Sequence, residues 1–212
     1  MASGNSHKKQ EIEQLFPNHT FVLPKERGIN FNPEETGSSF FENSLLKAEE
    51  LWKIVQKPVL ADDSGICVSI LNNRPGIFSA RYCGKNVPAG SLELSPDEQN
   101  RLLIEEVNDE IIEKNFDKLD PVLRRCFYVC SMVFYYGDFT YASVQETLEG
   151  SIVSSYDQQK GTGGFGYDPI VYLKNYDKTV SELPIEEKNR ISHRGKACSL
   201  LRPLIDAFSM HL

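Results

Sequence analysis

Four short polar clusters in this sequence combine residue types that bind phosphate, metal ions or flat rings. The first cluster, residues 3–9, reads Ser-Gly-Asn-Ser-His-Lys-Lys and leads into a predicted helix. Backbone N–H groups at a helix start, the positive end of the helix dipole and Lys8 would together form a seat for phosphate. The segment lacks the P-loop pattern, so an ordinary helix N-cap with surface lysines is the alternative interpretation.

The second cluster brings carboxylates, an amide and an amine to the start of one predicted helix. Residues 34–37 read Glu-Glu-Thr-Gly and are followed by Glu42, Asn43 and Lys47. Glu42 also fits the reciprocal carboxylate of a capping box that begins at Ser39, and Lys47 also fits a solvated helix position. The cluster therefore has both a chemical and a purely structural interpretation.

The third cluster consists of two adjacent carboxylates, Asp62 and Asp63, which follow an apolar run and precede Ser64 and Gly65. Adjacent acids in a turn are often simply solvated. At the end of an apolar strand, however, they can hold a hard cation such as Mg²⁺, which prefers a few carboxylates together with phosphate oxygens and water.

The fourth cluster is the glycine-rich segment 161–169, which reads Gly-Thr-Gly-Gly-Phe-Gly-Tyr-Asp-Pro. It contains Gly-x-Gly-x-x-Gly, but the dinucleotide motif must follow a strand and open a helix, and a β-branched run follows here instead. A flexible loop with an aromatic face (Phe165 or Tyr167) and the carboxylate of Asp168 favours a platform for a flat ring. A plain glycine-rich turn before a strand is the alternative. Lys188 and the basic group 192–196 come further along the chain.

The elements that must position these clusters alternate between helices and strands. Apolar spacing and capping residues predict helices at 6–16, 39–56, 97–106 with a continuation toward 115, and from 197 onward. Runs rich in β-branched and aromatic residues predict strands at 20–23, 59–61 and 66–70, and a hairpin of 125–136 and 139–148. Residues 62–65 would form a polar corner between two of these strands. The mixture predicts an α/β fold with a mixed sheet.

Length and charge limit the classes of function. A chain of 212 residues favours a single domain, 1–212. It carries 23 Lys and Arg against 30 Asp and Glu, and a net charge of −7 argues against broad binding to nucleic acid or to a membrane surface. This balance still allows a small polyanion held in a local basic pocket.

The cysteines and the apolar segments indicate the cellular compartment in which the protein is expected. Five cysteines, an odd number with no Cys-x-x-Cys pair, favour a reducing environment. The first residues contain no apolar stretch typical of a secretory signal. The longest apolar run, 126–136, is shorter than the ~18 residues of a membrane span. We therefore expect a soluble cytoplasmic protein.

Taken in order, six stretches of the sequence resemble the Ham1-like inosine triphosphate pyrophosphatase family. They are Ser3-Gly4-Asn5 with Lys8, and the segments 35–48, 61–65, 74–82, 163–169 and 187–194. Each motif alone is weak evidence for the family, but six motifs in the family's order over nearly the whole chain are specific for it. The resemblance implies a long mixed β-sheet flanked by helices in an elongated, two-lobed α/β fold with a nucleotide cleft between the lobes. It also implies a homodimer.

The resemblance implies an activity as well as a fold. Members of this family hydrolyse non-canonical purine nucleoside triphosphates, such as ITP, dITP, XTP and dXTP, to the monophosphate and pyrophosphate, with Mg²⁺ as cofactor. The expected partner is thus a single nucleoside triphosphate rather than a nucleic acid.

The same resemblance implies a role for each matching residue. Glu42 and Asp63 would hold Mg²⁺, and Asp63 would also be the general base for water. The phosphates would be bound by Ser3, Gly4, Asn5, Ser6, His7 and Lys8, with Lys47, Ser64 and Arg81. The base and sugar would be surrounded by Phe165, Gly166, Tyr167, Asp168, Lys188, His193 and Arg194. A donor such as Arg194 and an acceptor such as Asp168 would suit a 6-oxo purine and leave buried groups unpaired with adenine.

The sequence departs from the family pattern at several places, and two alternative functions stay open. The family has an apolar strand before Ser3, of which Met1 and Ala2 remain, so that strand is either very short or begins upstream. His7 stands where bacterial relatives usually carry Gly. One alternative function is that of a Maf-like pyrophosphatase for pyrimidine or modified nucleotides. The other is a catalytically silent nucleotide-binding module.

Overall fold

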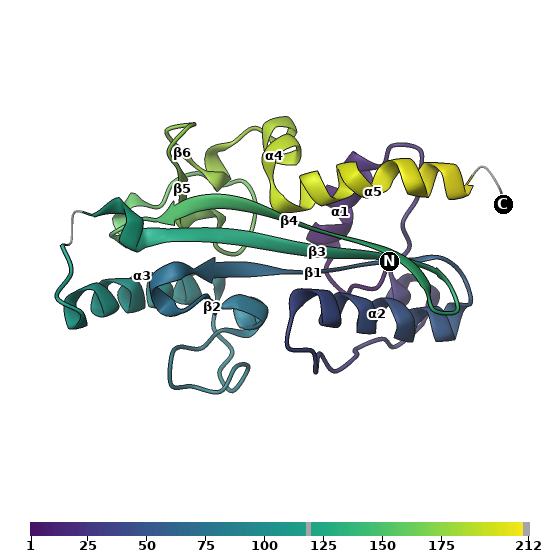
Figure 1. The fold of residues 1–212 in the computed structure, drawn as a ribbon, viewed down its shortest axis with the longest axis horizontal. Helices are drawn as coiled ribbons and strands as arrows, with labels where there is room; N and C mark the ends of the chain where they lie inside the picture. Colours follow the sequence, from purple (N-terminus) through teal and green to yellow (C-terminus); the bar gives the residue numbers. More distant parts are fainter. Residues whose placement is uncertain (118–119, 210–212) are drawn as a thin grey trace. The chain divides into compact units, whose positions relative to one another are not determined.

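The computed structural model describes residues 1–117 and 120–209. The helices are α1 (Ser6–Leu15), α2 (Phe40–Val55), α3 (Pro96–Glu113), α4 (Ile185–Ile191) and α5 (His193–Ser209). The strands are β1 (Val59–Val68), β2 (Arg74–Pro75), β3 (Arg125–Gly137), β4 (Thr140–Ile152), β5 (Val171–Leu173) and β6 (Lys178–Thr179). The predicted α/β class is confirmed (Figure 1).

The six strands form one sheet in the order β2-β1-β3-β4-β5-β6. We expected a mixed sheet; the pairings of β1 with β2, β4 with β5 and β5 with β6 are antiparallel. In register, Cys67 lies opposite Pro75, and Tyr172 lies opposite both Ser151 and Thr179.

The chain divides into two compact units. The first unit comprises Met1–Ser64, Val129–Thr147 and Asn189–Leu212, and the second comprises Gly65–Tyr128 and Leu148–Lys188. Each polar cluster is described below within its own unit.

In the first unit, β1 and β3 separate two apolar clusters, because successive side chains of a strand point to opposite faces. Leu60 and Met132 pack with apolar side chains of α1 and α5. Ala61 and Val133 pack with those of α2. Figure 1 shows the same arrangement, with α2 on one side of these strands and α1 and α5 on the other. The next two residues of β1, Asp62 and Asp63, must therefore also point to opposite faces.

The main correction to the predicted elements concerns residues 62–65. They form no corner, because β1 is one continuous strand from Val59 to Val68. Asp62 and Asp63 can stay inside a buried strand because partners on opposite faces neutralise them, as described below. The predicted strand at 20–23 is also wrong, since these residues carry no strand assignment. The carbonyl of Val22 bonds to the Met1 amine, and one such bond does not make a ladder.

The other predicted elements are confirmed with shifted ends. Ser39 caps α2, Ser95 caps α3 in a complete capping box, and the hairpin turns between β3 and β4 at the predicted place. Helix α3 continues to Glu113, and α5 begins at His193 rather than at 197. The five cysteines are free and buried.

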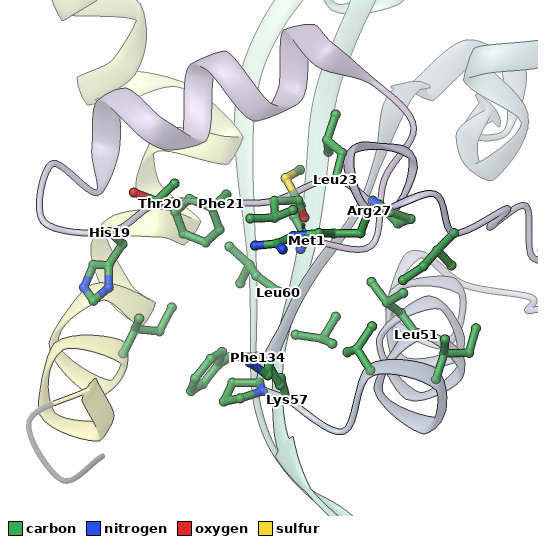
Figure 2. Close-up of a pocket in the computed structure, with 18 of the residues that line it drawn as sticks. Met1, His19, Thr20, Phe21, Leu23, Arg27, Leu51, Lys57, Leu60 and Phe134 are labelled. Carbon is green, nitrogen blue, oxygen red and sulfur yellow. Dashed lines mark hydrogen bonds between the residues drawn. The ribbon is translucent and has the colours of Figure 1, made fainter.

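A pocket of about 650 Å³ surrounds the amino terminus within the first unit (Figure 2). Its lining is largely apolar and includes Phe21, Leu60 and Phe134; among the described residues, it contains none of the predicted site residues. The Met1 amine donates to the carbonyl of Val22 at 2.9 Å, and burial lowers the pKa of this amine to about 6. The pocket is therefore distinct from the polar clusters. Within 1–117 and 120–209, no helix combines the length and apolar character that a membrane crossing requires.

Candidate functional site

Asp62 lies at the centre of a buried ion-pair network in the first unit. Its side chain points to the face covered by α1 and α5, as the alternation from Leu60 requires. Its Oδ2 lies 3.0 Å from the Lys8 ammonium and accepts a hydrogen bond from Nη2 of Arg194 at 3.0 Å. Arg194 also donates to Glu11 at 2.6 Å and, at 2.9 Å, to the hydroxyl of Ser64. The network ties α1 and α5 to β1.

The charge state of Asp62 follows from these neighbours. Burial alone would raise its pKa, but the charges of Lys8 and Arg194 hold that pKa well below its ordinary value. Oδ1 of this buried carboxylate has no hydrogen-bond partner among the described residues. Asp62 is thus an anion at neutral pH that organises two cations.

Asp63, one residue further, points to the opposite face and meets α2. Its Oδ1 accepts from the Lys47 ammonium at 2.9 Å, and its Oδ2 accepts from the Asn43 amide at 3.4 Å. The same ammonium donates to Glu35 at 2.8 Å. Lys47 therefore joins two carboxylates, Glu35 and Asp63, that are 28 positions apart in the sequence (63 − 35).

Burial acts differently on the partners in this second group. It raises the pKa of Asp63 above its ordinary value, although Lys47 opposes the shift. The pKa of Lys47 is raised despite its burial, because Asp63 and Asp62 favour its charged form. A carboxylate with a raised pKa is a better proton acceptor near neutral pH than an ordinary solvated one.

Glu42 occupies the capping position that the sequence also allowed. Its Oε2 accepts from the backbone N–H of Ser38 at 2.6 Å and from the Ser38 hydroxyl at 2.7 Å. These hydrogen bonds lower the pKa of Glu42. The structure thus gives Glu42 a role at the start of α2, and the carboxylate joined to Asp63 through Lys47 is Glu35.

The segment before α1 forms an N-cap. Oδ1 of Asn5 accepts from the backbone N–H groups of His7 and Lys8 at 2.9 and 3.2 Å. The Ser3 hydroxyl accepts from the N–H of Asn5 at 3.1 Å. Gly4 has open space where a Cβ would lie, and Ser6 begins the helix. The proposed phosphate seat is therefore a well-formed helix start whose Lys8 is tied to Asp62.

In the second unit, Asp168 organises the glycine-rich segment. Its Oδ1 accepts from the Tyr128 hydroxyl at 3.0 Å. Its Oδ2 accepts from the Lys188 ammonium at 2.8 Å and from the backbone N–H of Phe165 at 3.0 Å. The same ammonium lies 5.2 Å from the centroid of the Phe165 ring. An aromatic face and a cationic donor are thus held together, as expected of a platform for a flat ring.

Other residues of this segment have structural contacts. The Tyr167 hydroxyl donates to the carbonyl of Ser79, and the Asn100 amide donates to that of Gly166. Gly164 has a φ of +76°, and a Cβ there would lie 2.1 Å from Oδ2 of Asp168. Only glycine fits this position, because the carboxylate passes directly over the backbone.

The remaining predicted residues lie at element ends. His193 is the buried first residue of α5, and Arg81 ends a short 3-10 helix with its guanidinium 5.5 Å from the Phe78 ring centroid. The first unit therefore joins Lys8, Ser64 and Arg194 around Asp62, and Lys47 to Asp63. The second unit joins Phe165 and Lys188 around Asp168.

Two residues that complete these groups, Glu35 and Tyr128, had no role predicted from the sequence. Glu35 lay inside the second polar cluster, and its position 12 residues before Lys47 gave no helical spacing to reveal the contact. Tyr128 lay in an apolar segment predicted as a strand, where a tyrosine is expected to belong to the hydrophobic core. No local signal could have found Tyr128, since its partner is 40 residues away.

The side chains that could donate to a metal ion show whether this site could hold one. No group of three or more His, Cys, Asp and Glu side chains arranged to hold a metal occurs within residues 1–117 and 120–209. Glu35 and Asp63 are two carboxylates arranged around one positive charge, the Lys47 ammonium. Two carboxylates completed by phosphate oxygens and water are a common donor set for Mg²⁺. The residues therefore fit an ion that binds together with a phosphate ligand.

Comparison with known proteins gives concordant matches. A family model described as the Ham1 family matches residues 1–204. The dITP/XTP pyrophosphatase of Treponema denticola is 48% identical over 199 residues, which cover 93% of this chain and 92% of that relative. A solved HAM1 protein from Coxiella burnetii has a TM-score of 0.79 at 33% identity and covers 97% of this chain and 96% of its own. The Ham1 protein of Staphylococcus aureus has a TM-score of 0.73 at 36% identity, with coverage of 97% and 96%.

Proposed function

Because this chain belongs to the Ham1 family, we propose that it hydrolyses non-canonical purine nucleoside triphosphates, of the inosine and xanthosine types, to the monophosphate and pyrophosphate. The relative from Treponema denticola is named a dITP/XTP pyrophosphatase. The proposal rests on one observation, that the side chains of Asp62 and Asp63 point to opposite faces of β1. One carboxylate anchors the cations Lys8 and Arg194, and its neighbour, Asp63, is paired with Lys47 on the opposite face.

Asp63 is the proposed general base. It accepts the proton of a water molecule whose oxygen bonds to the α-phosphorus. The bond from that phosphorus to the bridging oxygen breaks, and its electron pair leaves with pyrophosphate. Lys8 and Lys47 offset the negative charge that builds on the phosphate oxygens. The raised pKa of Asp63 supports the role, because basicity near neutral pH favours proton transfer.

We propose that a divalent cation, Mg²⁺, completes this site. When bound, it would lower the pKa of the attacking water and offset charge on the phosphate oxygens. Glu42 and Asp63 were the ligands expected from the sequence. The contacts favour Glu35 beside Asp63, because these two carboxylates share Lys47 and Glu42 is engaged by Ser38.

A matched pair of variants distinguishes the two ligand sets. Glu35→Gln is expected to raise the Mg²⁺ concentration for half-maximal activity by about 10–100-fold, the range seen when a metal site loses a supporting carboxylate. Glu42→Gln is expected to leave that concentration within about twofold, because Gln keeps an oxygen that can accept from Ser38 at the start of α2. Titration of activity with Mg²⁺ measures both. The reverse result would restore Glu42 as the ligand.

Base recognition is assigned to the second unit. A 6-oxo purine stacks on Phe165 and accepts a hydrogen bond from Lys188 at its oxygen. Adenine would present an amino group there, so the base would offer no acceptor to the buried ammonium. Such a mismatch discriminates by a factor of ~10⁴. Asp168 was expected to accept from the base, but both of its oxygens already accept protein hydrogen bonds, which favours a supporting role.

The proposed function also includes where and how the protein acts. We propose a homodimer, as the resemblance to the family implies, and a location in the cytoplasm, since the five buried free cysteines suit a reducing compartment. Light scattering on the purified protein tests the dimer.

A panel of nucleoside triphosphates with pyrophosphate detection tests the activity. ITP, dITP and XTP are expected to release pyrophosphate in Mg²⁺ and not in excess chelator, with ATP about 10⁴-fold poorer in kcat/KM. A preference for pyrimidine or modified nucleotides would replace the proposal with a Maf-like activity. Tight ITP binding without pyrophosphate release would indicate a silent nucleotide-binding module.

A further inference from the structure

Tyr128 is a buried tyrosine whose hydroxyl is directed at the base-recognition group. It lies on β3 with 6% of its surface exposed, and Asp168 and Lys188 are buried to a similar extent. Its hydroxyl donates to Oδ1 of Asp168 at 3.0 Å. Burial, followed by the charge of Asp168, raises the pKa of Tyr128 well above its ordinary value, so the hydroxyl stays a donor.

The other oxygen of the same carboxylate holds the two groups that would meet the base. Oδ2 of Asp168 accepts from Lys188 and from the backbone of Phe165. A carboxylate is planar, so fixing Oδ1 also fixes the direction of Oδ2. A fixed carboxylate would therefore restrain the ammonium of Lys188 and the backbone of Phe165, whose ring centroid lies 5.2 Å from that ammonium.

We propose that Tyr128 is a positioning residue for recognition of the base, acting through Asp168 on Lys188 and Phe165. This inference rests on the proposed function. Without the hydroxyl, the carboxylate can rotate, and Lys188 loses the fixed direction that a hydrogen bond to a 6-oxo group requires. Because these residues would act on the base and not on the α-phosphorus, the effect should fall on binding rather than on the chemical step.

The experiment compares Tyr128→Phe with a matched control on the same strand. Tyr135 is also buried on β3, but its hydroxyl accepts from the backbone N–H of Phe139 at 3.0 Å, at the turn of the hairpin. Tyr128→Phe is expected to raise KM for ITP about tenfold, the factor appropriate to a hydrogen bond with a charged partner, with kcat within about twofold. Tyr135→Phe is expected to change neither constant by more than about twofold.

Two further variants locate the effect. Lys188→Ala is expected to raise KM for ITP about 100-fold, since it removes the donor itself together with a buried charge partner. In an Asp168→Ala background, which removes both side-chain oxygens, Tyr128→Phe is expected to have little additional effect, because the residue acts through that carboxylate.

The outcomes separate this inference from the proposed function. Unchanged KM in Tyr128→Phe together with raised KM in Lys188→Ala would overturn the role of Tyr128 and leave base recognition intact. Unchanged KM in both variants would overturn base recognition, and the role of Tyr128 with it. Equal losses of kcat/KM for ITP and ATP in Tyr128→Phe would indicate a purely structural hydroxyl and also overturn the inference.

Discussion

Asp63→Asn is expected to lower kcat for ITP hydrolysis by a factor of ~10³, within the range that general-base catalysis contributes. Asparagine keeps the shape of the side chain and an oxygen that can accept from Lys47, but it cannot take a proton from water. Nucleotide binding should change much less than turnover. Single-turnover rates and calorimetric titration with ITP in Mg²⁺ measure the two quantities separately.

An exposed aspartate provides the control for this substitution. Asp138 lies at the tip of the β3–β4 hairpin and is exposed, so Asp138→Asn changes the same chemical group in water. It is expected to leave kcat and the melting temperature unchanged. Near-normal turnover in Asp63→Asn would rule out the assignment of the general base and, with it, the proposed course of the reaction.

Local signals in the sequence were sufficient for most of the fold. Ser39 and Ser95 each precede a helix with a glutamate three residues on, and both helices begin within one residue of the predicted start. The hairpin turn was also predicted from a local sequence signal. The strand expected at 20–23 failed because a strand exists only through its neighbours, and Val22 pairs with the Met1 amine instead.

The continuous course of β1 could not be predicted from composition. Two adjacent aspartates in a buried strand are unfavourable unless each meets a cation, and polar runs of this kind usually mark turns. The cations come from Lys8 and Arg194 on one face and from Lys47 on the other, all distant in sequence. Only the packing of three helices on the strand makes the pattern stable.

The candidate site was predicted in part for the same reason. The motifs identified Lys47, Asp63 and Asp168, because family motifs are contiguous. Their partners Glu35 and Tyr128 are single residues with no pattern around them, and only the tertiary contacts connect them. Glu42 had two interpretations, and the contacts of Ser38 favour the capping one.

Asp62→Asn is expected to lower the free energy of unfolding by about 3–5 kcal/mol, the usual cost of removing one partner of a buried ion pair. The Asp62 side chain is fully buried, and the substitution would leave Lys8 and Arg194 with one fewer anion between them. The pKa of Asp62 is lowered in the folded protein, so its contribution is present above the unfolded pKa of about 4 and is lost as pH falls below it. Urea unfolding at neutral pH and under acid conditions measures both effects, and the variant should lack the part of the acid sensitivity that Asp62 supplies.

Asp206→Asn is the matched control for this stability prediction, because Asp206 lies in the same unit and also accepts from a basic side chain. It contacts His19 at 2.6 Å, but 43% of its side chain is exposed. A pair as exposed as this one contributes at most about 1 kcal/mol. If Asp62→Asn were no more destabilising than Asp206→Asn, the ion-pair network would contribute nothing to holding α1 and α5 on β1. Lys8 and Arg194 would then have to be positioned by the packing of their helices alone.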